Sequence, residues 1–99
     1  MRREDVLQLI SQHADELRQM GVTSLALFGS VGRDEARPDS DVDILIDLRR
    51  GIGLFGLFEI QRWLEDMLGV KVDLVTRGGV HPALRERIFG EAVDVIPAA

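Results

Sequence analysis

The chain has 99 residues, a formal net charge of −5 and no cysteine, which is enough for one core and predicts a single domain over residues 1–99. The acidic balance argues against direct binding of nucleic acid, because such binding depends on neutralising phosphates with basic side chains. The absence of cysteine excludes disulfides and zinc–thiolate sites, and no apolar run approaches the roughly 20 residues of a membrane span. We expect a cytoplasmic protein without a membrane segment or a signal peptide.

The spacing of apolar residues predicts helices and strands that alternate along the chain. In chain order these are a helix over 3–20, a strand near 23–28, a short helix near 30–35, a loop through Pro38, a strand near 41–48, a helix over 54–68, a strand around Asp73, a helix over 82–89 and a strand near 92–96. Gly21 and Gly69 are placed to end the two long helices. This order predicts an α+β (α/β) fold in which helices pack on a small sheet.

A possible phosphate cradle follows the first predicted strand. Gly29 ends the apolar run 25–28, and Ser30 is placed to cap the next helical turn. A glycine at such a junction lets the backbone approach a ligand, and the N–H groups of the first turn attract anions. Arg33, about one turn later, could bind the phosphates of the same ligand with its forked guanidinium group. The alternative is an ordinary turn followed by a solvated arginine.

Two aspartates on the next predicted strand point to metal-dependent phosphate chemistry. In the stretch 41–46, Asp41 and Asp43 alternate with aliphatic residues, so both carboxylates lie on one face, roughly 7 Å apart. Two neighbouring anions on a half-buried sheet favour a cation between them. Carboxylate oxygens suit Mg²⁺ or Mn²⁺, and two such ions can clamp the attacking and leaving oxygens of a phosphoryl transfer. A solvated Asp-x-Asp at a strand end is the alternative.

A third carboxylate, Asp73, is predicted on the polar face of a later strand, because the aliphatic residues alternate with it at 70, 72 and 74. If this strand neighbours the one with Asp41 and Asp43, the three aspartates converge. Asp73 would then hold a metal ion and draw the proton from an attacking hydroxyl. It could instead be a surface carboxylate beside Lys71. Asp47 shares the polar face but lies at the far end of its strand, so it is left out of the site.

These residues resemble a known family. Gly29-Ser30, ten intervening residues, the Asp41-Val42-Asp43 triplet and the later strand aspartate Asp73 are similar to the DNA polymerase beta-like nucleotidyltransferase superfamily, and within it to the minimal nucleotidyltransferase (MNT) proteins. The resemblance extends over nearly the whole chain. It implies the nucleotidyltransferase fold with a small mixed sheet, and transfer of a nucleoside monophosphate from a nucleoside triphosphate with two divalent ions.

The resemblance also implies roles and a partner. MNT proteins are typically antitoxins of HEPN-domain toxins and add AMP from ATP to the toxin, usually on a tyrosine. By motif position, Asp41 and Asp43 would bind both metal ions and Asp73 the catalytic one. Gly29 and Ser30 would hold the triphosphate, and Arg33 would assist.

Two other functions stay open. The domain could neutralise a toxin by contact alone, or transfer a nucleotide to a small acceptor such as an aminoglycoside. Phe55, Phe58 and Trp63 could form an exposed patch for a partner or for a second copy in a homo-oligomer. His13 and His81 are expected to have structural roles.

Overall fold

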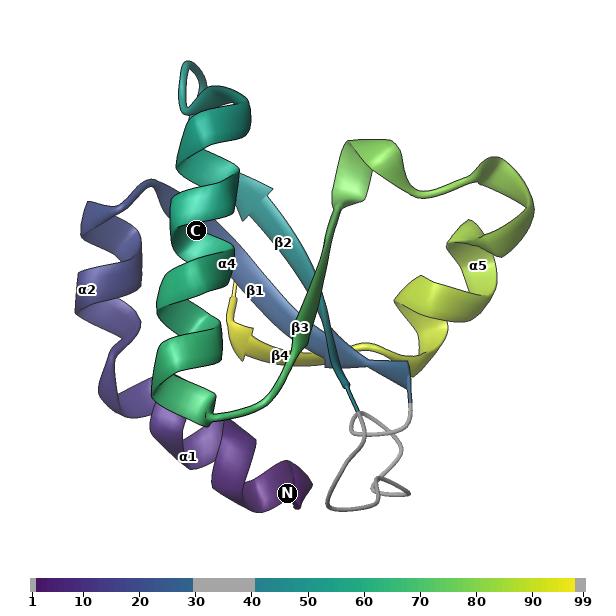
Figure 1. Cartoon of the computed structure of the whole chain (residues 1–99). Coiled ribbons are helices and arrows are strands. Elements are labelled where there is room, and N and C mark those ends of the chain that lie inside the picture. The colour runs from purple at the N-terminus through teal and green to yellow at the C-terminus, as the bar shows by residue number, and fades with distance from the viewer. Residues whose placement is uncertain (1, 30–40, 98–99) are drawn as a thin grey trace.

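The structure is a computed structural model that describes residues 2–29 and 41–97. Within these ranges the elements follow in the order α1, α2, β1, β2, α4, β3, η1, α5 and β4 (Figure 1). The predicted short helix near 30–35 and the loop through Pro38 lie outside the described residues. The other predicted elements are present with their bounds shifted by one or two residues, apart from a break in the first helix.

One mixed sheet forms the centre of the protein. Its strands are β1 (Val22–Phe28), β2 (Val42–Leu48), β3 (Val72–Thr76) and β4 (Val93–Ile96), in the spatial order β3-β2-β1-β4. β1 is antiparallel to both β2 and β4, whereas β2 and β3 are parallel. The mixed sheet expected from the family resemblance is therefore confirmed.

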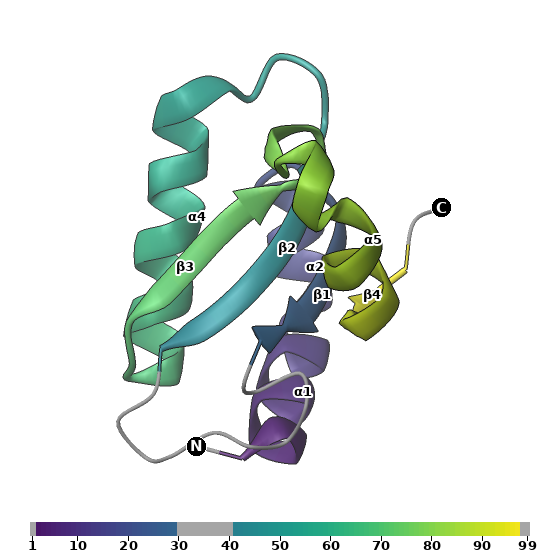
Figure 2. The same cartoon turned by 90° about the vertical axis from the view of Figure 1, so that its right-hand side faces the viewer.

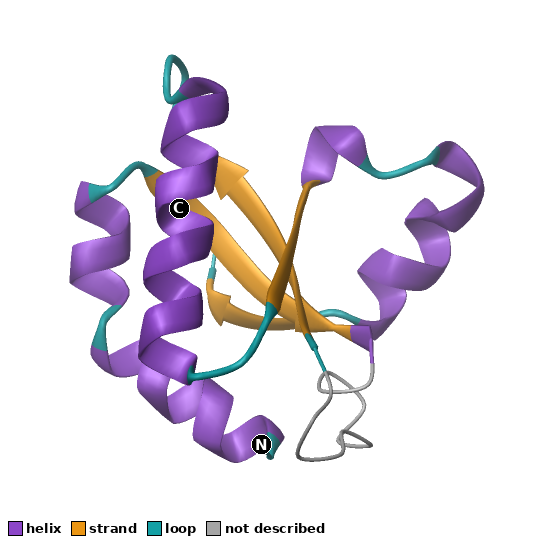
Figure 3. Ribbon diagram, in the orientation of Figure 1, coloured by secondary structure: helices purple, strands orange, loops and turns teal. Residues whose placement is uncertain are grey.

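Helices cover the two faces of this sheet unequally. α1 (Arg3–Gln12), α2 (Ala14–Gln19) and α4 (Gly53–Leu68) pack on one face, and α5 (Pro82–Glu91) lies on the other, after the short 3-10 turn η1 (Arg77–Gly79). Figure 2 shows α4 and α5 on opposite sides of the strands, and Figure 3 shows the three helices that share the first face. The layers follow from the way in which the strands distribute their apolar side chains.

The alternation of β2 illustrates that distribution. Val42, Ile44 and Ile46 are fully buried in the core that the sheet forms with α1, α2 and α4. Leu45 points the other way, into a smaller cluster with Ala26 of β1 and residues near α5. Because successive strand side chains leave opposite faces, this register directs the aspartates of β2 to the α5 side.

The first helix breaks at His13, and the predicted continuous helix over 3–20 is wrong there. The amide of His13 donates to the carbonyl of Ile10 (3.1 Å), three residues back, as in a tightened last turn. Its ring nitrogen Nδ1 lies 2.9 Å from Oε1 of Glu16, and the ring meets Trp63 edge-on at 5.6 Å. The sequence pattern missed the break because the buried residues on either side still share one apolar face.

α4 carries the predicted apolar stripe, with Ile60, Leu64 and Leu68 buried, and ends at Gly69 in the left-handed conformation (φ 71°). Trp63 is half-buried against the core, so it does not belong to an exposed patch. Within the described ranges, no helix has both the length and the apolar composition needed to cross a bilayer.

Exposed apolar side chains do occur on the first turns of α4. Leu54, Phe55 and Phe58 are exposed by 65, 87 and 54 %. The predicted exposure of both phenylalanines is confirmed. His81 caps α5, where its Nδ1 accepts the amide of Ala83 (3.1 Å), in agreement with a structural role.

Candidate active site

Asp43 and Asp73 are direct neighbours across two parallel strands. They are partners in the register of β2 and β3, so their Cα atoms are about 5 Å apart and their side chains leave the same face. Asp41 immediately precedes β2 and lies two residues before Asp43, so the two Cα atoms are about 7 Å apart and both side chains leave the same face. The three aspartates form a row on this face. The strand pairing on which the convergence of the three aspartates depends is therefore present.

Hydrogen bonds to the start of β3 position Asp73. The side chain of Gln61 donates from Nε2 to the carbonyl of Val72 (2.9 Å), and Oε2 of Glu65 accepts the Val72 amide (3.0 Å). On the other side of the strand, the Val42 amide donates to the carbonyl of Lys71 (2.9 Å). β3 is an edge strand, and these bonds satisfy backbone groups that an edge would otherwise leave open. The clamp from α4 holds Asp73 opposite Asp43.

Gly29 lies against the carboxylate of Asp43. Phe28, the last residue of β1, is the register partner of Asp43, and Gly29 follows it with φ of 69°. A Cβ on residue 29 would overlap Oδ2 of Asp43 and lie 3.1 Å from its Cγ. Only glycine combines this left-handed backbone with so close an approach. The glycine predicted to end the first strand therefore contacts one of the predicted metal-binding aspartates.

The donor set fits a hard divalent cation. Asp41 and Asp73 are exposed, so their oxygens are accessible to a ligand, and Asp43 between them in the row is half-buried. In the part of the chain that the structure describes, no three His, Cys, Asp or Glu side chains are placed so that they could hold a metal ion. Mg²⁺ is usually bound by one or two carboxylates together with substrate phosphates and water. An open row of carboxylates suits an ion whose coordination the substrate completes.

Lys71 is a further candidate residue, which the sequence pattern indicated only as a neighbour of Asp73. It is the single lysine of the chain. Val72 is fully buried between two exposed residues, so Lys71 and Asp73 share the opposite face. Continuing the parallel register by one residue from the pair of Val42 and Val72 places Lys71 opposite Asp41. Period-two alternation in the sequence already indicated the shared face, but the facing residue needed the register.

Ser30 and Arg33, predicted to hold the triphosphate, lie outside the described residues. Their roles stay predictions that rest on the sequence.

The sheet face toward α5 has a second set of polar contacts, at the end of the strands away from Asp43 and Asp73. Nε of Arg77 donates to Oγ of buried Ser24 (3.4 Å), and its Nη2 lies 3.8 Å from Oδ1 of Asp94. The guanidinium also stacks 5.6 Å over the ring of Phe89. Asp47 is the register partner of Ser24 and so belongs to this end. The catalytic candidates occupy one end of the face, and Arg77 ties η1, β1, β4 and α5 together at the other.

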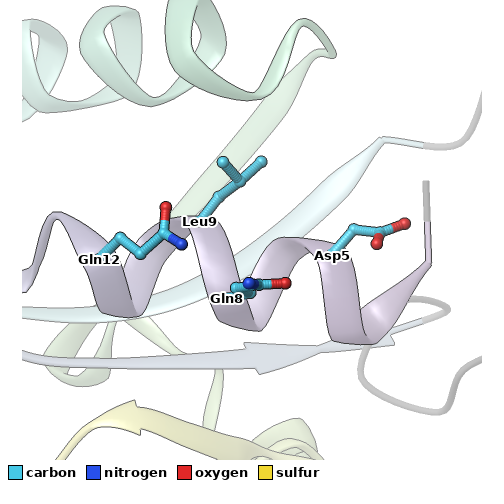
Figure 4. A pocket seen from close by; sticks show the side chains of 4 residues that line it. All are labelled: Asp5, Gln8, Leu9 and Gln12. Carbon is cyan, nitrogen blue, oxygen red and sulfur yellow. The ribbon is translucent and has the colours of Figure 1, made fainter.

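A hollow lies on the surface of α1, a helix that contributes none of the three aspartates. It has a volume of about 480 Å³, and its described lining is Asp5, Gln8, Leu9 and Gln12 (Figure 4). All four side chains come from one helix, and Figure 4 shows them spread along its surface without converging on a point. Its described lining includes one carboxylate, that of Asp5, and no cationic side chain, so it does not match the chemistry of the three aspartates.

The mixed sheet, with a glycine after its first strand and carboxylates on two adjacent parallel strands, agrees with the nucleotidyltransferase fold expected from the sequence. The family model described as nucleotidyltransferase domain matches residues 10–95. The chain therefore belongs to the nucleotidyltransferase domain family.

Relatives and solved structures agree with this family. The protein adenylyltransferase MntA of Thermococcus cleftensis is 37% identical over 93 residues, which cover 93% of this chain and 94% of that protein. A solved structure described as a minimal nucleotidyltransferase superposes with a TM-score of 0.83 and 35% identity, over 94% of this chain and 95% of that one.

A more distant structure shares the fold. It comes from a complex between a tri-AMPylated HEPN toxin of Shewanella oneidensis and its MNT antitoxin. The superposition has a TM-score of 0.67 and 20% identity, over 94% of this chain and 73% of that chain. At this identity the likeness concerns the fold alone.

Proposed function

We propose that this protein transfers AMP from ATP to a hydroxyl of a partner HEPN toxin in the cytoplasm, and thereby acts as its antitoxin. The observation that carries the proposal is the alignment of Asp43 with Asp73 across the parallel strands, with Gly29 against the Asp43 carboxylate. Support for a protein acceptor comes from the relatives named protein adenylyltransferase, and support for a HEPN toxin comes from the complex whose antitoxin shares this fold.

In this proposal, each residue of the site has a distinct task. Asp41, Asp43 and Asp73 would hold two Mg²⁺ ions, with Asp73 at the catalytic one, and Gly29, Ser30 and Arg33 would hold the triphosphate. Mn²⁺ could replace Mg²⁺, because both ions prefer carboxylate oxygen. The ions supply charge neutralisation at the attacking and leaving oxygens. The close approach of Gly29 leaves the Asp43 carboxylate in a position that a side chain at residue 29 would displace.

The transfer replaces one phosphorus–oxygen bond with another. A toxin hydroxyl, proposed to be that of a tyrosine, attacks the α-phosphorus while the bond to the β-phosphate breaks, and pyrophosphate leaves. The hydroxyl proton passes to Asp73, which faces Asp43 and is exposed to an incoming acceptor. The hydrogen bonds that Val72 forms with the side chains of Gln61 and Glu65 hold the neighbouring Asp73 carboxylate in position.

The test uses ATP labelled on the α-phosphate, Mg²⁺ and the product of the adjacent reading frame, which the proposal takes to be the HEPN toxin. We expect label to become stably attached to the toxin and its toxicity to fall. Asp43→Asn should abolish both effects, whereas Asp47→Asn, at the other end of the same strand, should leave both intact. A toxin that is silenced equally well by the Asp43→Asn variant, with no label attached, would contradict the proposal and favour neutralisation by binding alone.

A further inference from the structure

A groove opens directly beside Gly29, between the end of β1 and α5. Its volume is about 200 Å³, and its described lining consists of Phe28, Gly29, Leu84, Arg87, Ile88 and Glu91. The six residues come from two segments only, the end of β1 and one face of α5. Among them, only Gly29 was predicted as a site residue, with a role in holding the triphosphate.

The groove is continuous with the candidate active site. Phe28 pairs in register with Asp43, so the two side chains leave the same face of the sheet as direct neighbours. Gly29 contacts the Asp43 carboxylate itself. A nucleotide whose phosphates lie beside Asp43 would therefore have its nucleoside next to the groove.

The lining has the chemistry of a base-binding site. Phe28, Leu84 and Ile88 offer apolar surface, and Leu84 is 47 % exposed, so a flat ring can cover it. Arg87 and Glu91 lie one turn apart on α5, with Nε of the arginine 3.5 Å from Oε1 of the glutamate. Together they present donors and an acceptor at one rim. Ligand sites typically combine mostly apolar walls with a few such polar groups.

We propose that this groove binds the nucleoside of the donor nucleotide, with Arg87 and Glu91 recognising the polar edge of an amino-bearing base such as adenine. The inference rests on the proposed function and adds a specificity site to it. The guanidinium of Arg87 donates to a ring nitrogen of the base, and the carboxylate of Glu91 accepts from its amino group. A phosphate would leave the apolar walls unused, and a tyrosine ring carries one hydroxyl for two polar partners.

The decisive experiment compares the binding of AMP-PNP and of inorganic tripolyphosphate, both with Mg²⁺, by titration calorimetry. Leu84→Asn removes stacking on the base, and Arg87→Ala removes one charged contact. Each variant should therefore raise the Kd of AMP-PNP about tenfold. The Kd of tripolyphosphate should not change. Arg85→Ala is the matched control, because Arg85 is an exposed arginine of the same helix outside the groove. It should alter neither Kd.

Base recognition has its own test, using ITP, in which the amino group of ATP is replaced by a carbonyl oxygen. The protein should prefer ATP to ITP about tenfold, and Glu91→Ala should reduce that preference. Equal binding of the two nucleotides by the unaltered protein would contradict the role of Glu91.

Several outcomes would overturn the inference. Equal losses for AMP-PNP and tripolyphosphate would make Arg87 a phosphate ligand. An unchanged Kd for AMP-PNP with a raised KM for the toxin would assign the groove to the acceptor. If the groove variants bind AMP-PNP normally while Asp43→Asn still abolishes label transfer, the groove inference fails and the proposed function stands. If the unaltered protein binds no nucleotide, both fail.

Discussion

The two faces of the sheet are built from the same strands but carry different kinds of side chain. On the face toward α1, α2 and α4, the strand residues are aliphatic and almost completely inaccessible. On the face toward α5, a small apolar cluster around Leu45 separates the aspartates from the contacts of Arg77. α5 itself has no fully buried residue. One face provides most of the core, and the other keeps charged groups accessible to a ligand.

This division separates stability from chemistry at the level of single residues. On β3, Val72 is fully buried and its neighbour Asp73 is exposed. Because successive side chains of a strand leave opposite faces, adjacent substitutions are expected to have unrelated consequences. The following predictions test that separation.

The largest effect is expected at Asp73. Asp73→Asn should lower the rate of AMP transfer about 1,000-fold, since it removes a metal ligand and proton acceptor worth several kcal/mol of barrier. The free energy of unfolding should change by less than about 0.5 kcal/mol, because the side chain is exposed. Initial rates with labelled ATP and urea unfolding measure the two quantities.

Val72→Ala is the matched variant on the same strand. It should lower the free energy of unfolding by about 2 kcal/mol and leave the transfer rate of the folded protein within about threefold. A loss of stability in Asp73→Asn with full activity would reverse the assignment of the two faces.

On the face toward α1, α2 and α4, the largest loss of stability is expected from a substitution at Leu64. Leu64→Ala creates a cavity against the sheet and should cost about 3 kcal/mol of unfolding free energy. Phe55→Ala, on the same helix but 87 % exposed, should cost less than about 0.5 kcal/mol. Equal midpoints in urea for the two variants would mean that the face toward α4 is not the main core.

Gly29 allows strain and steric exclusion to be separated. Gly29→Ala and Gly53→Ala place a Cβ on backbones with nearly the same φ, 69° and 68°, and each should cost about 1 kcal/mol of stability. Only at residue 29 would the Cβ overlap Asp43, whereas residue 53 faces open space. Transfer should therefore fall about tenfold in Gly29→Ala alone. Equal activity of the two variants would remove Gly29 from the site.

The smallest effect is expected at Lys71. Its register position opposite Asp41 predicts that Lys71→Gln raises the KM for ATP about threefold at low salt with kcat unchanged, because an exposed charge is partly screened. Lys71→Arg retains the charge and should behave as the unaltered protein. A change in kcat without a change in KM would instead give Lys71 a role in the chemical step.

Much of the fold was predictable because the local patterns are strong. The stripe of Ile60, Leu64 and Leu68 predicted α4, and alternation around Asp43 predicted which side of β2 is polar. The break at His13 was not predictable from periodicity, because Val6 and Leu17 remain on one apolar face across it.

The arrangement of the site was predictable only in part. Alternation placed Asp43 and Asp73 on polar faces, but their direct pairing depends on the register between strands that are far apart in the sequence. That register is supported by the hydrogen bonds between Val72 and the side chains of Gln61 and Glu65, which no local pattern reveals. The groove beside Gly29 escaped prediction for the same reason, since Phe28 and Leu84 meet only in the folded chain.

The central claim, that the aspartates at one end of the sheet hold the divalent ions, is tested most directly by counting bound Mn²⁺. Electron paramagnetic resonance on the protein with AMP-PNP should detect two Mn²⁺ per chain in the unaltered protein and in Asp47→Asn, but no more than one in Asp43→Asn. Two tightly bound ions in Asp43→Asn would contradict the account.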